Sequence, residues 1–336
     1  MNYIRKNLEK SNKVLQGLGI PYSALISIIF GMMVFSFPIG VFIVFNSDIG
    51  QEINFEYPLN GFEFFNDYFG YEIPFDIELG DAFIVIWAIF VILFSISILG
   101  PKKDFLKTLF LTMAEGKSVI ETNYLITTIK WFSILILISG IIIYVQEGVG
   151  ISIKAPTIEN NLIQFFSVSV APLSEEIGFR VLLIGIPLYA IYSERICFRN
   201  FFKSLWNPSE NLNIGESWKA ISLIVGVAVF FGFAHIMFGE PWSSGKFAQA
   251  MAGGMIIGWV YFRSGLVPAI LIHWATNYFI FSYVYLIADI NMVPIQEAFS
   301  HPLLMTFQIL FMVLGIISIA IMISNHYCKK EEKLKI

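Results

Sequence analysis

The chain has 336 residues, of which 57% are hydrophobic and only 14% are charged. Soluble domains carry about 25% charged residues, so the composition excludes an ordinary soluble protein and indicates a membrane protein. The formal net charge of −4 gives no reason to expect nucleic acid as a partner. Cys197 and Cys328 are the only cysteines, and without a CxxC pair they support neither a zinc cage nor a disulfide framework.

Eight apolar segments have roughly the length that a transmembrane helix needs, about 20 residues. In chain order they are residues 23–45, 82–100, 124–145, 162–192, 220–238, 247–262, 266–288 and 303–324. The first is too long for the core of a signal peptide and is expected to stay as an uncleaved span. The sixth is rich in glycine and alanine, which favours close helix packing. We therefore expect an all-α, polytopic membrane helix bundle with about eight transmembrane helices.

The positions of lysine and arginine predict the orientation of these spans. Residues 46–81 contain nine acidic residues and no Lys or Arg, whereas the next connection contains Lys102, Lys103 and Lys107. Basic and acidic connections alternate in this way across all eight spans. Because cytoplasmic loops carry the excess of basic residues, we expect a multi-pass protein with both termini in the cytoplasm.

The sequence divides into three predicted regions. Residues 1–160 form N-terminal transmembrane helices, with an acidic and aromatic external loop at 46–81 that we expect to lie on the membrane surface. Residues 161–288 form a core that carries the polar motifs. Residues 289–336 form the last transmembrane helix and a basic cytoplasmic tail.

The first polar motif lies inside segment 162–192. An ionisable side chain at membrane depth costs roughly 2.5–3.5 kcal/mol on insertion scales, so such residues are functional candidates. On a helix, Glu176 and Arg180 are separated by four positions, share a face and can pair. Glu175 then points elsewhere and lacks a cation of its own, which suits a general base. A purely structural salt-bridge network is the alternative.

Two further motifs lie in later spans. Phe231 and His235 share a face near the end of the fifth span, and His273 and Asn277 share a face in the seventh. An imidazole beside an amide offers two neutral hydrogen-bond donors for an oxyanion. Taken singly, each motif is more typical of helix packing and interhelical hydrogen bonds.

The three motifs together supply a base, a water partner and oxyanion donors, as hydrolysis of an amide requires. Glu175, His235 and His273 also match a His₂Glu zinc set in ligand type. The sequence has no HExxH motif, so carboxylate-activated water and metal-bound water, with Zn²⁺ as the candidate cofactor, both stay open.

The ordered motifs Glu-Glu-x-x-x-Arg, Phe-x-x-x-His and His-x-x-x-Asn resemble those of the CPBP (CAAX protease and bacteriocin-processing, or Abi) family of intramembrane peptidases. The resemblance covers residues 162–288. It implies a CAAX-type endopeptidase, glutamate-dependent or metal-assisted, that acts on a prenylated CAAX or other hydrophobic peptide within the bilayer. It also implies that Glu175 and His235 activate water, that His273 and Asn277 form the oxyanion site, and that Glu176, Arg180 and Phe231 support them.

Other classes of function share these residues. Intramembrane Glu, His and Arg are typical of proton relays, so a proton-coupled membrane transporter is an alternative, although the sequence shows no internal repeat. A non-catalytic immunity or scaffold protein is another. The predicted topology also places His273 near the cytoplasmic end of its span and His235 late in a span that runs outward. The fifth helix must therefore be tilted or shifted for the two to meet.

Overall fold

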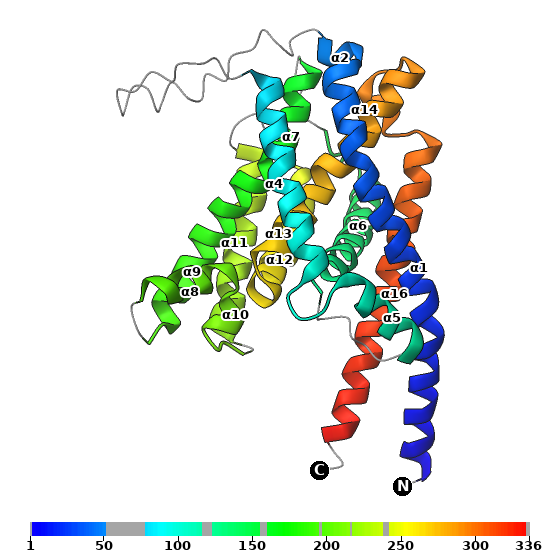
Figure 1. Ribbon diagram of the computed structural model, residues 1–336, viewed down its shortest axis with the longest axis vertical. Coiled ribbons are helices and arrows are strands. Elements are labelled where there is room, and N and C mark those ends of the chain that lie inside the picture. Colours follow the sequence, from blue (N-terminus) through cyan, green and yellow to red (C-terminus); the bar gives the residue numbers. More distant parts are fainter. Residues whose placement is uncertain are drawn as a thin grey trace.

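The computed structural model describes residues 2–51, 78–115, 123–154, 160–194, 197–215, 217–237 and 242–333. This part of the chain is helical and contains no β-strand (Figure 1). The helices are α1 (Asn2–Asn46), α2 (Asp48–Gln51), α4 (Leu79–Leu99), α5 (Phe105–Glu115), α6 (Tyr124–Gly148), α7 (Asn161–Glu175), η2 (Glu176–Gly185), α8 (Ile186–Tyr192), α9 (Phe198–Trp206), α10 (Pro208–Asn211), α11 (Trp218–Met237), α12 (Lys246–Ser264), α13 (Leu266–Trp274), η3 (Ala275–Phe279), α14 (Ile280–Asn291), α15 (Ile295–Ala298) and α16 (Pro302–Lys333).

Among the described helices, six stretches are long and apolar enough to cross a membrane. They are Gly17–Asn46, Leu79–Leu99, Tyr124–Gly148, Trp218–Met237, Leu266–Asn291 and Pro302–His326. The prediction of an all-α, polytopic membrane bundle is confirmed, and the count of eight is not. The other two predicted spans, 162–192 and 247–262, are helical, but the first carries three charges and is divided into α7, η2 and α8, and the second is a 19-residue helix rich in small residues.

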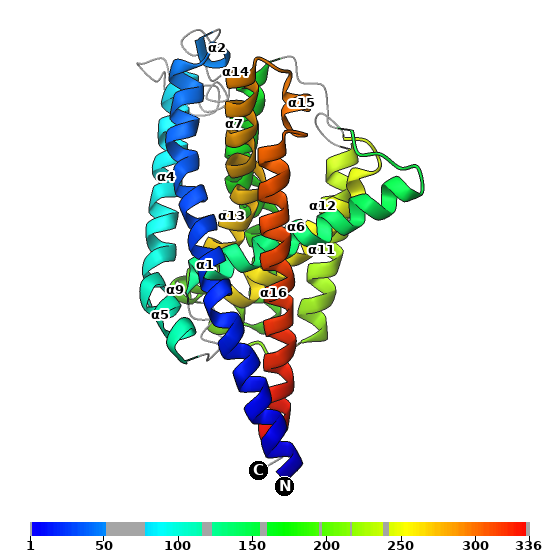
Figure 2. The same ribbon diagram turned by 90° about the vertical axis from the view of Figure 1, so that its right-hand side faces the viewer.

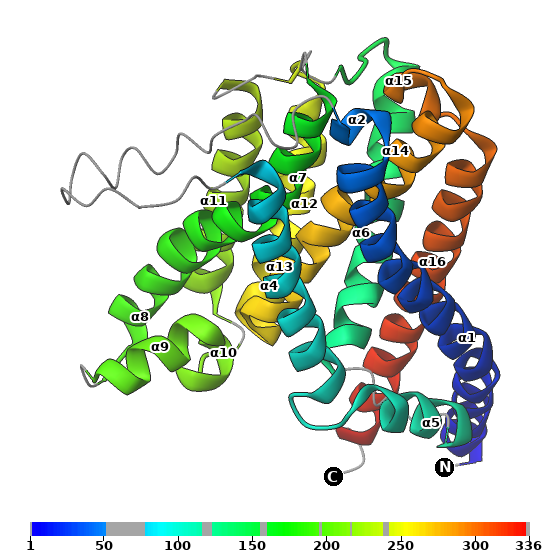
Figure 3. The ribbon, with the colours of Figure 1, turned by 45° about the horizontal axis from the view of Figure 1, so that its top comes forward.

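The helices form one bundle, and the N-terminal end of α1 and the C-terminal end of α16 lie at the same end of it. Figure 2 shows α1 and α16 side by side, with the N and C labels close together. Helices α8, α9 and α10 lie on the opposite flank, with α4 and α13 between the two groups (Figure 3). The predicted surface loop at 46–81 joins α1 to α4; its residues 52–77 lie outside the described part of the chain.

Asparagine side chains cap the N-terminal ends of α6 and α7. The side chain of Asn123 accepts hydrogen bonds from the backbone N–H groups of Leu125 and Ile126 at the start of α6, and Asn160 does the same at the start of α7. These contacts satisfy N–H groups that have no partner within the helix. Between α12 and α13, Gly265 adopts φ +96°, a conformation that side chains disfavour, and lets the chain reverse there.

Two motif regions are π-helical rather than α-helical. Element η2 begins at Glu176 and widens the helix, so that the N–H of Ile186 bonds to the carbonyl of Val181, five residues earlier. Pro187 has no N–H to continue the regular ladder and its ring would clash with the carbonyl four residues back, which favours a widened turn just before it. Element η3 begins two residues after His273 and contains Asn277. Single π turns are often found at functional sites.

Candidate active site

The buried centre of the site is a chain of three side chains, Arg180, Glu176 and His273. Nε of Arg180 lies 3.1 Å from Oε2 of Glu176, which confirms the predicted pairing of these two residues. The other carboxylate oxygen of Glu176 lies 2.8 Å from Nδ1 of His273. Glu176 and Arg180 are 0% and 1% exposed, so water does not screen these contacts. The ion pair therefore joins η2 to α13 through the imidazole.

Glu175 occupies the more open side of the same imidazole. Its Oε2 lies 3.9 Å from Nε2 of His273, and its side chain is 32% exposed. Because Glu175 is the last residue of α7 and Glu176 the first of η2, the two neighbouring carboxylates reach opposite nitrogens of one ring. The Glu175 side chain, which the sequence assigned as the base, is thus the more exposed of the pair, although its Oε2 is buried and has no hydrogen-bond partner among the described residues.

His235 reaches the site from α11. Its Nδ1 lies 2.9 Å from the carbonyl oxygen of Phe231. The Phe231 ring lies between the two histidines, with its centroid 4.5 Å from that of His235 and 6.2 Å from that of His273. The guanidinium of Arg180 lies 4.6 Å from the centre of the same ring. His235 also interacts electrostatically with Glu175 and His273.

The packing of α11 against α12 helps to place His235 near His273. Helix α12 runs antiparallel to α11, with Gly232 close to Phe247 and Gly258 close to Ile224. His235 therefore lies at the end of α11 that adjoins the start of α12. Phe231, one turn earlier, faces His273 and brings the two histidines to one region.

The hydrogen bonds of the two imidazoles determine where their protons lie. A carboxylate and a carbonyl oxygen can only accept, so Nδ1 donates in both His273 and His235. In the neutral form of each ring, Nε2 then carries a lone pair and no proton. With Nδ1 donating to Glu176, Nε2 of His273 can act as a donor only when the ring carries a second proton.

Asn277 follows His273 by four residues and lies in η3. Its Oδ1 lies 3.4 Å from Oγ1 of Thr276, which also donates to the carbonyl of His273 at 2.8 Å. Within the described residues no hydrogen bond occupies Nδ2 of Asn277, and its side chain is partly exposed. Nδ2 is therefore available as a donor for a bound molecule.

Packing fixes the position of the site residues. Trp274, next to His273, is fully buried among rings that include Phe37, Phe94 and Tyr278, and this anchors α13 against α1 and α4. On α12, a Cβ atom at Gly254 would come within 3.0 Å of the Phe231 side chain. The small residues of α12 thus let α11 approach closely enough to place Phe231 and His235.

The metal set that the sequence allowed does not assemble in the described part of the chain. No group of three or more His, Cys, Asp and Glu side chains there could hold a metal ion. Nδ1 of each histidine is already committed to an acceptor, which leaves one ring nitrogen per residue. The Glu176–His273 contact resembles the carboxylate that orients a metal-binding histidine, but it equally orients a catalytic imidazole.

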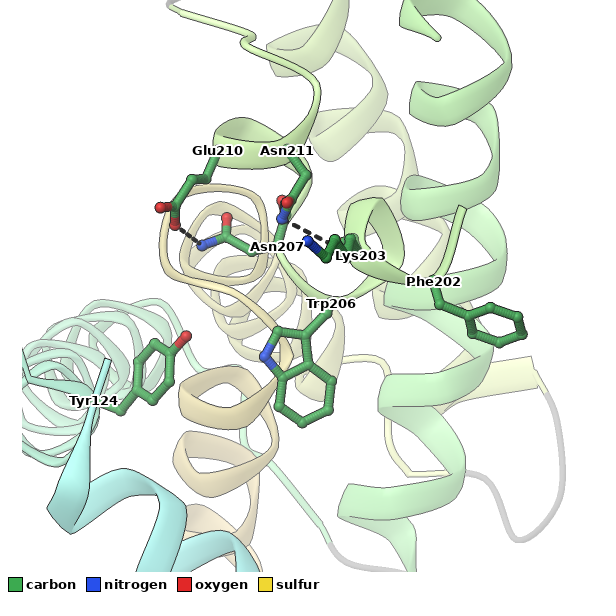
Figure 4. A pocket seen from close by; sticks show the side chains of 7 residues that line it. All are labelled: Tyr124, Phe202, Lys203, Trp206, Asn207, Glu210 and Asn211. Carbon is green, nitrogen blue, oxygen red and sulfur yellow. Dashed lines mark hydrogen bonds between the residues drawn. The ribbon is translucent and has the colours of Figure 1, made fainter. Parts of the chain in front are cut away.

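A separate pocket lies beside α9 and α10. It has a volume of about 410 Å³ and is lined by Tyr124, Phe202, Lys203, Trp206, Asn207, Glu210 and Asn211 (Figure 4). None of the motif residues lines it. The recurrence of Phe198, Phe202 and Trp206 at every fourth position, flanked by Arg199 and Lys203, was the available signal for the amphipathic helix α9.

Comparison with known proteins places the motifs in a family. Residues 158–279 match the family model described as type II CAAX prenyl endopeptidase Rce1-like. No curated protein and no solved structure matches the chain significantly. The matched region contains every motif residue and confirms the CAAX protease resemblance predicted from the motifs. Together with the six apolar helices of the described part of the chain, the match supports an integral, multi-pass membrane protein whose residues 158–279 are similar to a CAAX protease family.

Proposed function

We propose that the protein is a glutamate-dependent intramembrane endopeptidase, because residues 158–279 match the Rce1-like type II CAAX prenyl endopeptidase model. It hydrolyses a peptide bond near the C-terminus of a prenylated CAAX-type or other hydrophobic peptide that enters from the bilayer. Residues 161–288 form the catalytic core, and both chain termini lie in the cytoplasm. The observation that carries the proposal is the placement of Glu175, partly exposed, against His273 while Glu176 and Arg180 are buried behind the same ring.

In the proposed reaction, Glu175 takes a proton from a water molecule while the water oxygen attacks the scissile carbonyl carbon. The unprotonated Nε2 of His235 accepts the second hydrogen bond of that water. The negative charge that develops on the carbonyl oxygen is stabilised by Nδ2 of Asn277 and by His273 as an imidazolium. The C–N bond then breaks, and the leaving nitrogen takes the proton held by Glu175. The products are a carboxylic acid and an amine.

Glu176 and Arg180 are positioning residues in this scheme. The Glu176 carboxylate holds the Nδ1–H of His273 and stabilises the imidazolium, as the buried carboxylate of a catalytic triad does for its histidine. Arg180 balances the charge of Glu176, which would otherwise be costly in a buried position. Four alternating charges on Arg180, Glu176, His273 and Glu175 leave the site close to neutral.

The proposal is tested with purified protein and a quenched fluorescent farnesylated CAAX peptide. Wild type is expected to cleave it, and Glu175→Ala and His235→Ala are expected to lose cleavage while they keep their thermal unfolding midpoint. Cleavage that survives both substitutions would remove these residues from the site. Proton flux in liposomes that depends on Glu175, without cleavage of any peptide, would assign a transporter instead.

A further inference from the structure

We infer that Lys246 binds the free C-terminal carboxylate of the substrate and so restricts cleavage to bonds near a chain end. This inference rests on the proposed peptidase function and adds the residue that determines specificity. The half-buried Lys246 is the first residue of α12. It interacts electrostatically with both Glu175 and His235, the two residues proposed to activate the water.

The chain holds Lys246 in place through contacts with neutral groups. Its Nζ donates to Oε1 of Gln249 at 2.8 Å and lies 4.2 Å from the centre of the Trp242 ring. The N–H of Trp242 in turn donates to the carbonyl of His235 at 3.0 Å. The connection that precedes α12 is also held by α6, because the side-chain amide of Gln146 donates to the carbonyl of Gly245 at 2.9 Å. Trp242 thus links the ammonium group of Lys246 to the backbone of His235.

Lys246 differs from the other cation of the site. Arg180 is fully buried and forms an ion pair with Glu176, so a ligand cannot reach it. Within the described residues, no acidic side chain forms an ion pair with Lys246, and its neutral partners can yield to a stronger acceptor. A flexible lysine stem allows Nζ to move toward such an acceptor.

A free carboxylate that enters a membrane site needs a partner of opposite charge, because desolvation of an isolated charge is costly. Among the cations of the described site residues, the half-buried Lys246 is held by neutral partners, whereas Arg180 is paired with Glu176. A peptide that ends a few residues after the scissile bond can place its carboxylate on the Lys246 side chain. An internal bond of a long chain brings no carboxylate there.

The test compares two farnesylated peptides that differ only in a C-terminal carboxylate or carboxamide. Wild type is expected to prefer the carboxylate in kcat/KM by roughly ten-fold or more, the scale of one charge-assisted hydrogen bond. Lys246→Gln is expected to bring the kcat/KM ratio of acid to amide close to one, because it slows cleavage of the acid more than cleavage of the amide. Lys246→Arg is expected to keep part of the preference.

Lys219→Gln provides the matched control, because Lys219 is exposed near the start of α11, the end of that helix remote from His235, and the substitution removes the same charge. It should keep the wild-type ratio. Equal cleavage of both peptides by wild type would overturn the inference and leave the peptidase function standing. So would a Lys246→Gln variant that slows both peptides equally. Cleavage of neither peptide by wild type would overturn the proposed function itself.

Discussion

Nδ1 of His273 lies 2.8 Å from Oε1 of Glu176, and this contact joins two residues that are 97 positions apart in the chain. The carboxylate is fully buried and also pairs with Arg180. Since Glu176 can only accept, it fixes the proton of His273 on Nδ1 and turns Nε2 toward Glu175. The second glutamate of the motif therefore sets the chemistry of a ring on another helix.

Glu176→Gln should lower kcat by roughly 10²–10⁴-fold with little change in KM, because an amide no longer stabilises the imidazolium that donates in the transition state. The substitution also leaves the Arg180 charge unpaired, at a cost of about 3–5 kcal/mol in stability. Steady-state kinetics and thermal unfolding in the same detergent measure the two effects separately.

The double variant Glu176→Gln/Arg180→Met separates positioning from folding. It removes both charges, so it should recover much of the lost unfolding midpoint without recovering kcat. Recovery of catalysis in the double variant would show that the ion pair serves only the packing of the helices.

Asn277→Ala should reduce kcat by roughly 10²–10³-fold while KM changes little, since an oxyanion donor acts mainly in the transition state. Thr276→Val is the matched control. It removes the hydrogen bond from Thr276 to Asn277 but leaves the Nδ2 donor, so a loss of only a few-fold is expected. A raised KM with unchanged kcat in Asn277→Ala would instead assign the amide to substrate binding.

Gly254→Ala should lower both stability and kcat, because its new Cβ would lie 3.0 Å from the Phe231 side chain and 3.3 Å from Cα of Ala228. Overpacking of this kind costs about 1–3 kcal/mol and would displace Phe231 and His235. Gly253→Ala is the neighbouring control. Its Cβ would meet only Leu135, at 3.9 Å, so the thermal midpoint should stay unchanged or rise. Equal effects of the two substitutions would contradict the packing of α11 on α12.

Wild-type activity should survive chelators, because the proposed attack on the peptide uses a carboxylate and two imidazoles whose Nδ1 atoms are already engaged. The measurement combines cleavage rates in 1,10-phenanthroline with elemental analysis of the purified protein. Activity that is lost on chelation and restored by Zn²⁺ would instead support Glu175, His235 and His273 as metal ligands.

The sequence was sufficient for the features that depend on local spacing. Four-residue separations predicted the Glu176–Arg180 pair and the common face of Phe231 and His235, and both contacts are present. The glycine and alanine content of segment 247–262 predicted close helix packing, and α12 packs closely on α11. Such features follow from helix periodicity alone.

Features that depend on how the helices pack could not be read from the sequence. The sequence paired Glu176 with Arg180 only, because nothing local shows that Glu176 meets His273 from α13. The count of eight spans also went beyond the six that length and apolarity support, since 162–192 trades hydrophobicity for charged site residues.

A double-mutant cycle in the peptide-cleavage assay tests the central claim most directly, namely that Glu175 and His235 act on the same water. kcat/KM is measured for wild type, Glu175→Gln, His235→Ala and the double variant. Residues that act as a unit give non-additive losses, so the double variant should be little slower than the slower single variant. Losses that simply multiply, or single variants that cleave at the wild-type rate, would contradict the account.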